Sequence, residues 1–186
     1  MNYYSTYYSP IGKLYLVSDG AVLTGLFFDA EKILSNIERN AEKGSWKEIE
    51  GKKEPCFQQK SLPVLEKTKQ WLDLYFQGRE PDFFPELSFH DTPFREEVWE
   101  LLKEIPYGKT VSYGDLAKKI AAHHGIKKMS AQALGGAVGK NPISIIIPCH
   151  RVIGADGSLV GYGGGMNRKK YLLELEGIQI IDKTDK

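Results

Sequence analysis

Residues 141–152 of this 186-residue chain read NPISIIIPCHRV. The apolar run 143–147 indicates a buried segment, and a proline and Cys149 follow it directly. His150 and Arg151 come next, and positive charge close to a thiol favours the thiolate, which is its nucleophilic form. The stretch therefore predicts a cysteine nucleophile that is held in place by its surroundings. The alternative is a small buried hydrophobic residue, which is the ordinary role of a free cysteine.

The order of these residues limits the type of cysteine site. Adjacent side chains diverge on a strand or a helix, so Cys149 and His150 can share a proton only across a turn or through a water molecule. This disfavours the Cys–His pair of a protease, whose members come from distant parts of the sequence. None of the four histidines has metal-ligand spacing with a cysteine, so we expect neither a metal site nor a cofactor.

A glycine-rich segment, GYGGG, occupies residues 161–165. Glycine lets backbone N–H groups approach a ligand closely, so this loop can form the wall of a pocket for a flat group, with Tyr162 as its lid. The spacing is not that of a dinucleotide-binding motif. The alternative is a surface loop that binds nothing.

The composition is that of a globular protein, with 41% hydrophobic and 26% charged residues. No apolar run approaches the roughly 20 residues that span a bilayer, which excludes a membrane protein. Two cysteines are too few for a disulfide framework, and the first residues lack the features of a secretory signal. We therefore expect a reducing, cytoplasmic location, with Cys56 as a half-exposed structural thiol.

The net charge of +1 hides an uneven distribution. Residues 103–170 contain 11 basic side chains but only three acidic ones. Such an excess indicates a polyanionic partner such as nucleic acid. The alternative is that these lysines only make helix faces soluble.

The first part of the chain is predicted to be rich in β-strands, at residues 3–8, 14–18 and 22–28. Asp19-Gly20 signals a hairpin between the last two, because both turn positions of the favoured turn need positive φ. Asp29 is expected to cap one helix, and Ser61 a second that ends before Gly78. Residues 44–60 show no clear period. We place a domain boundary near residue 88, which divides the chain into 1–88 and 89–186.

The second part is predicted to be mainly helical. Thr92-Pro93 begins a helix that ends by Pro106, and Ser112 and Ser130 are expected to cap two shorter helices. Two short helices joined by a loop suggest a helix-turn-helix. The last helix is expected to begin after Asn167 and to stop at Gly177.

The stretch 141–152, the loop 161–165 and the sequence LLELEG at 172–177 together closely resemble the methylated-DNA–protein-cysteine methyltransferases, or O6-alkylguanine-DNA alkyltransferases. The resemblance is dense over residues 92–177 and looser before them. It implies an α+β protein, with an N-terminal ribonuclease H-like β-sheet domain and a C-terminal helical domain that contains a DNA-binding helix-turn-helix.

The resemblance also implies the activity. Cys149 would accept the alkyl group of O6-methylguanine, and of O4-methylthymine, from a flipped-out nucleotide in a single irreversible turnover. The partner would be double-stranded DNA, bound through the minor groove largely independently of sequence, and the protein would be a monomer that needs no cofactor.

Five residues match the catalytic positions of the family. Cys149 resembles the acceptor, and His150 the base that takes the thiol proton through a water, while Glu176 orients the imidazole. Asn141 is similar to the residue that ties the turn before the cysteine, and Tyr113 to the tyrosine that serves guanine N3. Without the resemblance, Glu176 would be a solvated helix end, Asn141 a turn former and Tyr113 a packing aromatic.

The resemblance extends to substrate and DNA contacts. The amide of Gly163 would meet O6, the carbonyls of Cys149 and Val152 would accept from the exocyclic amine, and Tyr162 and Val138 would line the pocket. The expected DNA contacts are Ser130, Ala131, Gln132, Lys127, Lys128, Lys140 and Arg151, the last with an internal ion pair as its alternative. Gln132 departs from the family, which often has an arginine finger there.

Two other functions fit parts of the pattern. A non-catalytic module that only recognises alkylated DNA would use the same helices, but such relatives lack the cysteine. A cysteine hydrolase would use the thiol, but it would turn over repeatedly.

Overall fold

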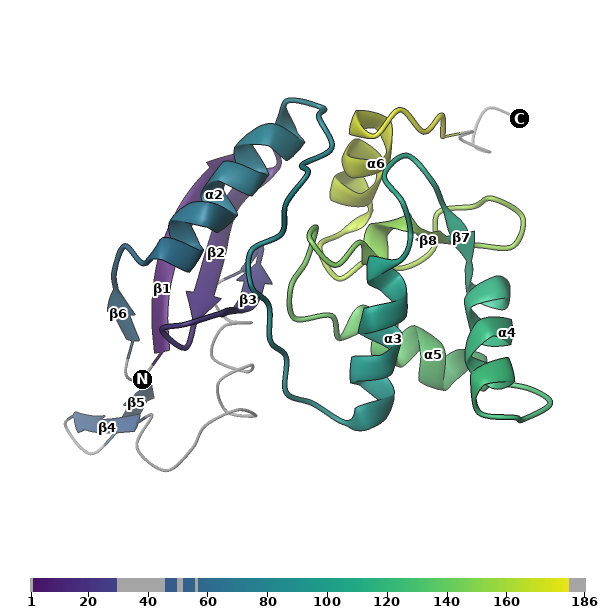
Figure 1. The fold of residues 1–186 in the computed structure, drawn as a ribbon, viewed down its shortest axis with the longest axis horizontal. Helices are drawn as coiled ribbons and strands as arrows, with labels where there is room; N and C mark the ends of the chain where they lie inside the picture. Colours follow the sequence, from purple (N-terminus) through teal and green to yellow (C-terminus); the bar gives the residue numbers. More distant parts are fainter. Residues whose placement is uncertain (1, 30–45, 50–51, 56, 181–186) are drawn as a thin grey trace. The chain divides into compact units, whose positions relative to one another are not determined.

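The computed structural model describes residues 2–29, 46–49, 52–55 and 57–180. The chain forms two compact units, Met1–Asp91 and Thr92–Lys186 (Figure 1). The sequence placed the boundary near residue 88, within the connection that precedes the first helix of the second unit.

The first unit is built on a mixed four-stranded sheet (Figure 1). In sheet order the strands are β3 (Leu23–Phe27), β2 (Gly12–Ser18), β1 (Asn2–Ser9) and β6 (Phe57–Gln59). β1 pairs antiparallel with β2 and parallel with β6. Helix α2 (Pro63–Phe76) packs on this sheet. The core between them contains Leu14, Leu16, Leu23, Leu26, Leu65, Leu72 and Tyr75, all fully buried.

The hairpin signalled by Asp19-Gly20 joins β2 and β3, so this prediction is confirmed. The turn differs in detail, because Gly20 has a φ of +117° but Asp19 does not have a positive φ. The carboxylate of Asp19 instead accepts hydrogen bonds from the N–H groups of Ala21 and Val22, both at 2.9 Å. A side-chain turn of this kind takes the place of the two-residue turn that the sequence favoured.

Ser61 does not cap α2, so this prediction is wrong. The N-cap position is Leu62, and Pro63 begins the helix. The hydroxyl of Ser61 donates a hydrogen bond to the Glu66 carboxylate at 3.0 Å. The proline supplies the start signal here, because its missing N–H is not needed in the first turn of a helix.

The segment 44–60, which showed no period, contains three short strands. Besides β6, these are β4 (Trp46–Ile49) and β5 (Lys52–Pro55), which pair with each other antiparallel. They are rich in lysine and glutamate, residues that are depleted in strands. The sequence pattern therefore did not predict these strands. The helix expected after Asp29 and the side chain of Cys56 lie outside the described residues.

The second unit is mainly helical (Figure 1). Its elements are α3 (Pro93–Lys103), β7 (Val111–Ser112), α4 (Tyr113–His123), α5 (Ala131–Gly139), the 3-10 turn η1 (Cys149–Arg151), β8 (Val152–Ile153) and α6 (Met166–Leu175). β7 and β8 pair in parallel. The expected caps are in place, since the hydroxyls of Ser112 and Ser130 accept from Asp115 N–H and Ala133 N–H.

Helices α4 and α5, the expected helix-turn-helix pair, pack against each other, and α5 also packs against α3. The indole N–H of Trp99 on α3 donates to the Ala137 carbonyl at 2.9 Å. α5 is thus fixed by its buried side, while Gln132 and its neighbours stay exposed. This is the arrangement needed for a helix that presents its outer side to a partner.

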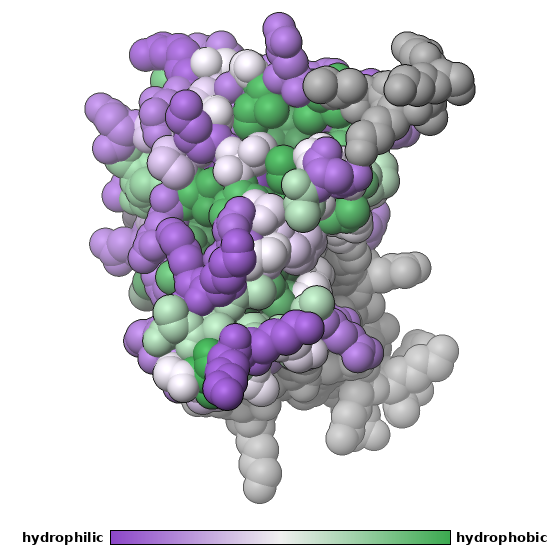
Figure 2. All heavy atoms as spheres, turned by 90° about the vertical axis from the view of Figure 1, so that its right-hand side faces the viewer, coloured by the Kyte–Doolittle hydropathy of each residue, from purple (hydrophilic) through white to green (hydrophobic). Residues whose placement is uncertain are grey.

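Figure 2 shows the side of the molecule on which α4 and β7 lie, with hydrophilic side chains separated by smaller apolar areas. Within the described part of the chain, no helix has the length and apolar composition needed to cross a membrane.

Candidate active site

The segment before Cys149 is a tightly folded turn. Ile143, Ile145 and Ile147 are fully buried, and Ile145 has a φ of +72°, the one positive φ among the described residues other than glycine. A β-branched residue rarely adopts this conformation, so the surroundings must hold it. The sequence revealed the burial of this run but not its strained backbone.

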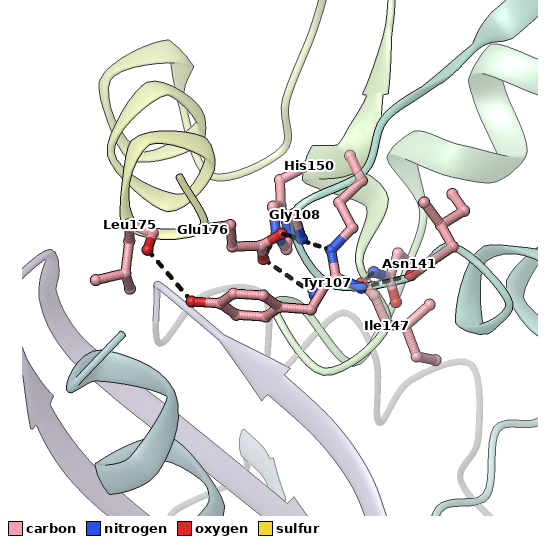
Figure 3. A network of polar contacts seen from close by, with 9 residues as sticks. Tyr107, Gly108, Asn141, Ile147, His150, Leu175 and Glu176 are labelled. Carbon is pink, nitrogen blue, oxygen red and sulfur yellow. Dashed lines mark hydrogen bonds and ion pairs between the residues drawn. The ribbon is translucent and has the colours of Figure 1, made fainter. Parts of the chain in front are cut away.

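The side chain of Asn141 holds this turn together. Its Oδ1 accepts from the Ile143 N–H at 3.0 Å, and its Nδ2 donates to the Ile147 carbonyl at 2.8 Å (Figure 3). The same Nδ2 lies 3.1 Å from Sγ of Cys149. One amide group therefore fixes both the backbone before the cysteine and the position of its sulfur.

Cys149 begins the turn η1 and is buried, with 6% of its surface exposed. Burial raises the pKa of its thiol above the ordinary value, because a low-dielectric surrounding disfavours the thiolate. The Asn141 amide, the charge of Lys169 and the backbone N–H groups of Cys149 and His150 all lower this pKa in opposition. The sulfur is therefore a protonated thiol at rest, surrounded by groups that stabilise its anion.

His150 and Glu176 lie together in a buried network (Figure 3), to which Arg151 also belongs. Nε2 of His150 lies 2.7 Å from Oε1 of Glu176. Arg151 donates to both oxygens of that carboxylate, at 2.8 and 3.0 Å, and to the Ile105 carbonyl at 2.5 Å. The backbone N–H of Gly108 donates to Oε2 at 3.2 Å. The carboxylate is thus fully surrounded by donors.

Gly108 is required at its position. Its φ is +68°, and a Cβ there would lie 3.1 Å from the backbone oxygen of Glu176. A side chain would push the loop away and remove one donor from the network.

The ionisation of this network follows from its contacts. Burial alone would raise the pKa of Glu176, but the hydrogen bonds and charges of His150 and Arg151 outweigh it and lower the pKa to about 2. Burial also lowers the pKa of His150, although Glu176 opposes this shift. At neutral pH we therefore expect an anionic Glu176 and a neutral His150.

Lys169 is a member of the site that the sequence analysis missed. Its side chain is fully buried in α6, and its Nζ donates to the carbonyls of Val152 and Val160 at 2.6 and 2.7 Å. Burial lowers its pKa to about 8, and the Cys149 thiolate opposes this shift. The sequence did contain one indication that Lys169 is buried. It lies three and four positions before the buried Leu172 and Leu173 in α6, and residues at these spacings share one face of a helix.

The remaining expected pocket residues belong to several elements of the second unit. Tyr113 begins α4, and Val138 is buried at the end of α5. Burial raises the pKa of Tyr113, and the charge of Cys149 raises it further. Burial also raises the pKa of Tyr162, whose ring lies edge-on to the His150 ring with 6.4 Å between centroids.

The backbone groups expected to contact the substrate have protein partners of their own. The carbonyl of Val152 accepts from Lys169, and the carbonyl of Cys149 accepts from the Val152 N–H. A carbonyl oxygen has two lone pairs, so each can accept one further hydrogen bond. Gly163 is exposed in the loop that precedes α6.

The expected DNA contacts separate into two groups. Those on α5 and beside it are exposed, namely Ser130, Ala131, Gln132, Lys127, Lys128 and Lys140. Arg151 is different, because it is 8% exposed and bound to Glu176. Its assignment as a phosphate contact is wrong, and the internal ion pair that was its alternative is what the structure contains.

Comparison with known proteins covers both units. The sequence model for the ribonuclease-like domain of 6-O-methylguanine DNA methyltransferases matches residues 2–89. The model for the DNA binding domain of the same proteins matches residues 93–178. This confirms the predicted α+β fold class, with a ribonuclease-like domain before a helical DNA-binding domain.

Individual relatives extend over nearly the whole chain. A methylated-DNA–protein-cysteine methyltransferase of Haemophilus influenzae is 39% identical over 183 residues, 97% of this chain and 89% of that protein. The structure of Mycobacterium tuberculosis OGT in complex with DNA covers 94% of this chain and 92% of its own, with 40% identity and a TM-score of 0.69. The O6-methylguanine-DNA methyltransferase of Pyrococcus kodakaraensis has a TM-score of 0.66 at 27% identity, over 96% of this chain and 100% of its own. The chain therefore belongs to the O6-methylguanine-DNA methyltransferase family.

Proposed function

We propose that Cys149 is the residue that accepts the alkyl group in the reaction of this family, the repair of O6-methylguanine in DNA. The observation that supports this most directly is the position of its sulfur, 3.1 Å from the Asn141 amide and among groups that favour the thiolate. A soft anionic sulfur is well suited to displace an aryl-type oxygen from a methyl carbon. The S–C bond forms as the C–O6 bond breaks, and the electron pair stays on the base.

His150 is the proposed base. Because Glu176 is ionised, it can only accept, so Nε2 of His150 bears the proton of their shared hydrogen bond. The other ring nitrogen, Nδ1, is then the basic one. We propose that it takes the thiol proton through a bridging water, which the lowered pKa of His150 allows at neutral pH.

Tyr113 and the Gly163 amide are the proposed donors to the leaving base. The raised pKa of Tyr113 keeps its hydroxyl protonated, so it can donate a hydrogen bond to guanine N3 as negative charge develops there. The carbonyls of Cys149 and Val152 would accept from the exocyclic amine, and Tyr162 and Val138 would enclose the ring.

The proposed DNA surface is the exposed side of α5 with the lysines beside it. Small residues on this helix permit close contact with a DNA backbone in the minor groove, and Lys127, Lys128 and Lys140 would bind phosphates. A base within a duplex must leave the stack before its O6 atom can be reached, at a few kcal/mol. Gln132 would fill the gap, with weaker electrostatic help than an arginine gives.

The thioether that forms on Cys149 has no route back to a thiol in this site, so each chain would act once. We propose that it does so as a monomer, on double-stranded DNA, in the reducing cytoplasm. Residues 89–186 contain every group proposed for the reaction, and residues 1–88 form the ribonuclease-like domain.

The experiment that tests this proposal counts repaired bases per chain. A duplex with O6-methylguanine is mixed with limiting protein, and restored guanine is measured by digestion and chromatography until the reaction stops. We expect a plateau of one guanine per active chain. A plateau well above one would indicate a hydrolase, and binding without any restored guanine would indicate a module that only recognises the lesion.

A further inference from the structure

A cluster of three potential metal ligands lies in the second unit, formed by residues that the proposed reaction does not use. Glu97 belongs to α3, His123 is the last residue of α4, and His124 is the C-cap of that helix. One ligand atom from each lies within 4.8 Å of the other two. The sequence did not predict this cluster, because Glu97 lies 26 residues before His123 and only the fold brings them together.

The two imidazoles contact different oxygens of the same carboxylate. Nδ1 of His123 lies 2.6 Å from Oε1 of Glu97, and Nε2 of His124 lies 2.7 Å from Oε2. Consecutive residues of a helix point about 100° apart, so they do not usually face one partner. Here His123 is the last residue of α4 and His124 its C-cap, and both rings contact the carboxylate on α3, with 5.5 Å between their centroids.

The donor set selects a class of metal. Imidazole nitrogen and carboxylate oxygen suit Zn²⁺ and its neighbours in the first transition row, whereas Mg²⁺ and Ca²⁺ take oxygen ligands almost exclusively. Donors around a tetrahedral Zn²⁺ lie about 2.0–2.2 Å from the metal, and therefore about 3.4 Å from one another. The two contacts with Glu97, at 2.6 and 2.7 Å, are shorter than that value, and all three donor atoms lie within 4.8 Å of one another, so small side-chain rotations would place them around one ion.

The exposure of the three side chains fits an open site. The Glu97 side chain is 19% exposed, whereas His124 and His123 are 45% and 74% exposed. The carboxylate is held at the base, and the imidazoles reach the solvent from which an ion would enter. Three protein ligands leave a fourth position for water.

We infer that Glu97, His123 and His124 form a binding site for one divalent transition-metal ion of the zinc class. The ion would lie at the C-terminus of α4, where the helix dipole favours positive charge. It would join the end of α4 to α3 immediately before residues 125–130, which lead into α5. Because it binds only the folded unit, it would raise the unfolding temperature by mass action.

The test measures binding of Zn²⁺ alone to the reduced full-length protein, after treatment with a chelator, in competition with a chromophoric indicator. Wild type and Cys149→Ser are titrated in parallel, because a thiol is itself a ligand for zinc. The variants are Glu97→Gln and the double variant His123→Gln/His124→Gln. The matched controls are Glu100→Gln, an exposed carboxylate one turn further along α3, and His90→Gln in the first unit.

We expect one equivalent of Zn²⁺ to bind to wild type, to Cys149→Ser and to both controls. Glu97→Gln and the double histidine variant should each weaken Zn²⁺ binding by at least about tenfold. In the same variants, Zn²⁺ should no longer raise the unfolding temperature. Circular dichroism checks that these surface variants remain folded. The inference is overturned if the double variant binds Zn²⁺ as wild type does, or if binding disappears with Cys149→Ser instead.

Discussion

Nζ of Lys169 donates a hydrogen bond of 2.6 Å to the carbonyl of Val152, three residues after the proposed nucleophile. A second bond, of 2.7 Å, reaches the Val160 carbonyl, so one buried ammonium group joins α6 to both ends of the segment 152–160. The same charge lowers the pKa of Cys149. Lys169 is therefore positioned to act on the backbone of the proposed pocket and on the thiol together.

Lys169→Met keeps the length of the side chain but removes its charge. The pKa of Cys149 should then rise further, because a group that favours the thiolate is lost. At pH 7, below the Lys169 pKa of about 8, we expect alkylation of Cys149 by iodoacetamide to slow by about threefold to tenfold, since one pKa unit changes the thiolate fraction tenfold. Lys170→Met, in the neighbouring position, is the control and should react as wild type does. An unchanged pH profile in Lys169→Met would show that the ammonium has no effect on the thiol.

Asn141→Ala removes the donor to Sγ and both hydrogen bonds that hold the turn. We expect the free energy of unfolding to fall by about 2 kcal/mol, because buried backbone groups lose their partners. Methyl transfer in single-turnover experiments should slow by at least about tenfold.

Asn141→Asp keeps one of the two hydrogen bonds that hold the turn. It keeps an acceptor for the Ile143 N–H, but it loses the donor to the Ile147 carbonyl and to Sγ. It also places negative charge next to the sulfur and so raises the pKa of Cys149. We expect this variant to be more stable than Asn141→Ala in urea denaturation and yet to transfer methyl no faster. Faster transfer by the aspartate variant would contradict the proposed role of the amide.

Glu176→Gln tests the buried ion pair through its pH dependence. The pKa of Glu176 falls from 4.5 to about 2 on folding, so its contribution to stability is complete above pH 4.5 and is lost as the pH falls towards 2. At pH 7 the variant should lose about 3 kcal/mol in urea denaturation, and the difference from wild type should shrink steadily below pH 4.5. Glu174→Gln, exposed on the same helix, should show no such trend. A difference that stays constant down to pH 2.5 would rule out this account.

Gln132→Arg tests the proposed DNA surface. A new cation on the DNA-facing side of α5 should increase the magnitude of the slope of log K against log salt, by up to about 0.9 if it neutralises one phosphate, and tighten binding to an undamaged duplex. Gln70→Arg places the same added charge on the exposed side of α2 in the first unit and serves as the control. Fluorescence anisotropy at several salt concentrations measures the DNA affinity of both variants. Equal salt slopes for Gln132→Arg and Gln70→Arg would argue against α5 as the DNA-binding helix.

Local signals in the sequence predicted the parts of the fold that depend on neighbouring residues. Ser112 and Ser130 cap their helices because a hydroxyl before a helix needs only the next turn of backbone to act. Asp19-Gly20 marks a hairpin for the same reason. The lysine-rich strands β4 and β5 have no such signal, since strand pairing depends on a partner elsewhere in the chain.

The residues of the candidate site could be predicted where the sequence motif is specific. They could not be predicted where tertiary contacts determine the conformation or burial of a residue. The stretch 141–152 indicated the thiol and its neighbours. The positive φ of Ile145 does not follow from local sequence, because it depends on packing against distant segments, and the burial of Lys169 was indicated only by its spacing from Leu172 and Leu173. Arg151 was predicted to contact a phosphate because its actual partner, Glu176, lies 25 positions away in the sequence.

The most direct measurement is the position of the transferred methyl group. Wild type and Cys149→Ser are each mixed with excess duplex containing O6-methylguanine, and the intact mass is followed before peptide digestion and sequencing by mass spectrometry. The account predicts a gain of one methyl per wild-type chain, confined to Cys149, and none in the serine variant. A methyl group on Cys56, or an unmodified wild-type chain together with restored guanine, would contradict it.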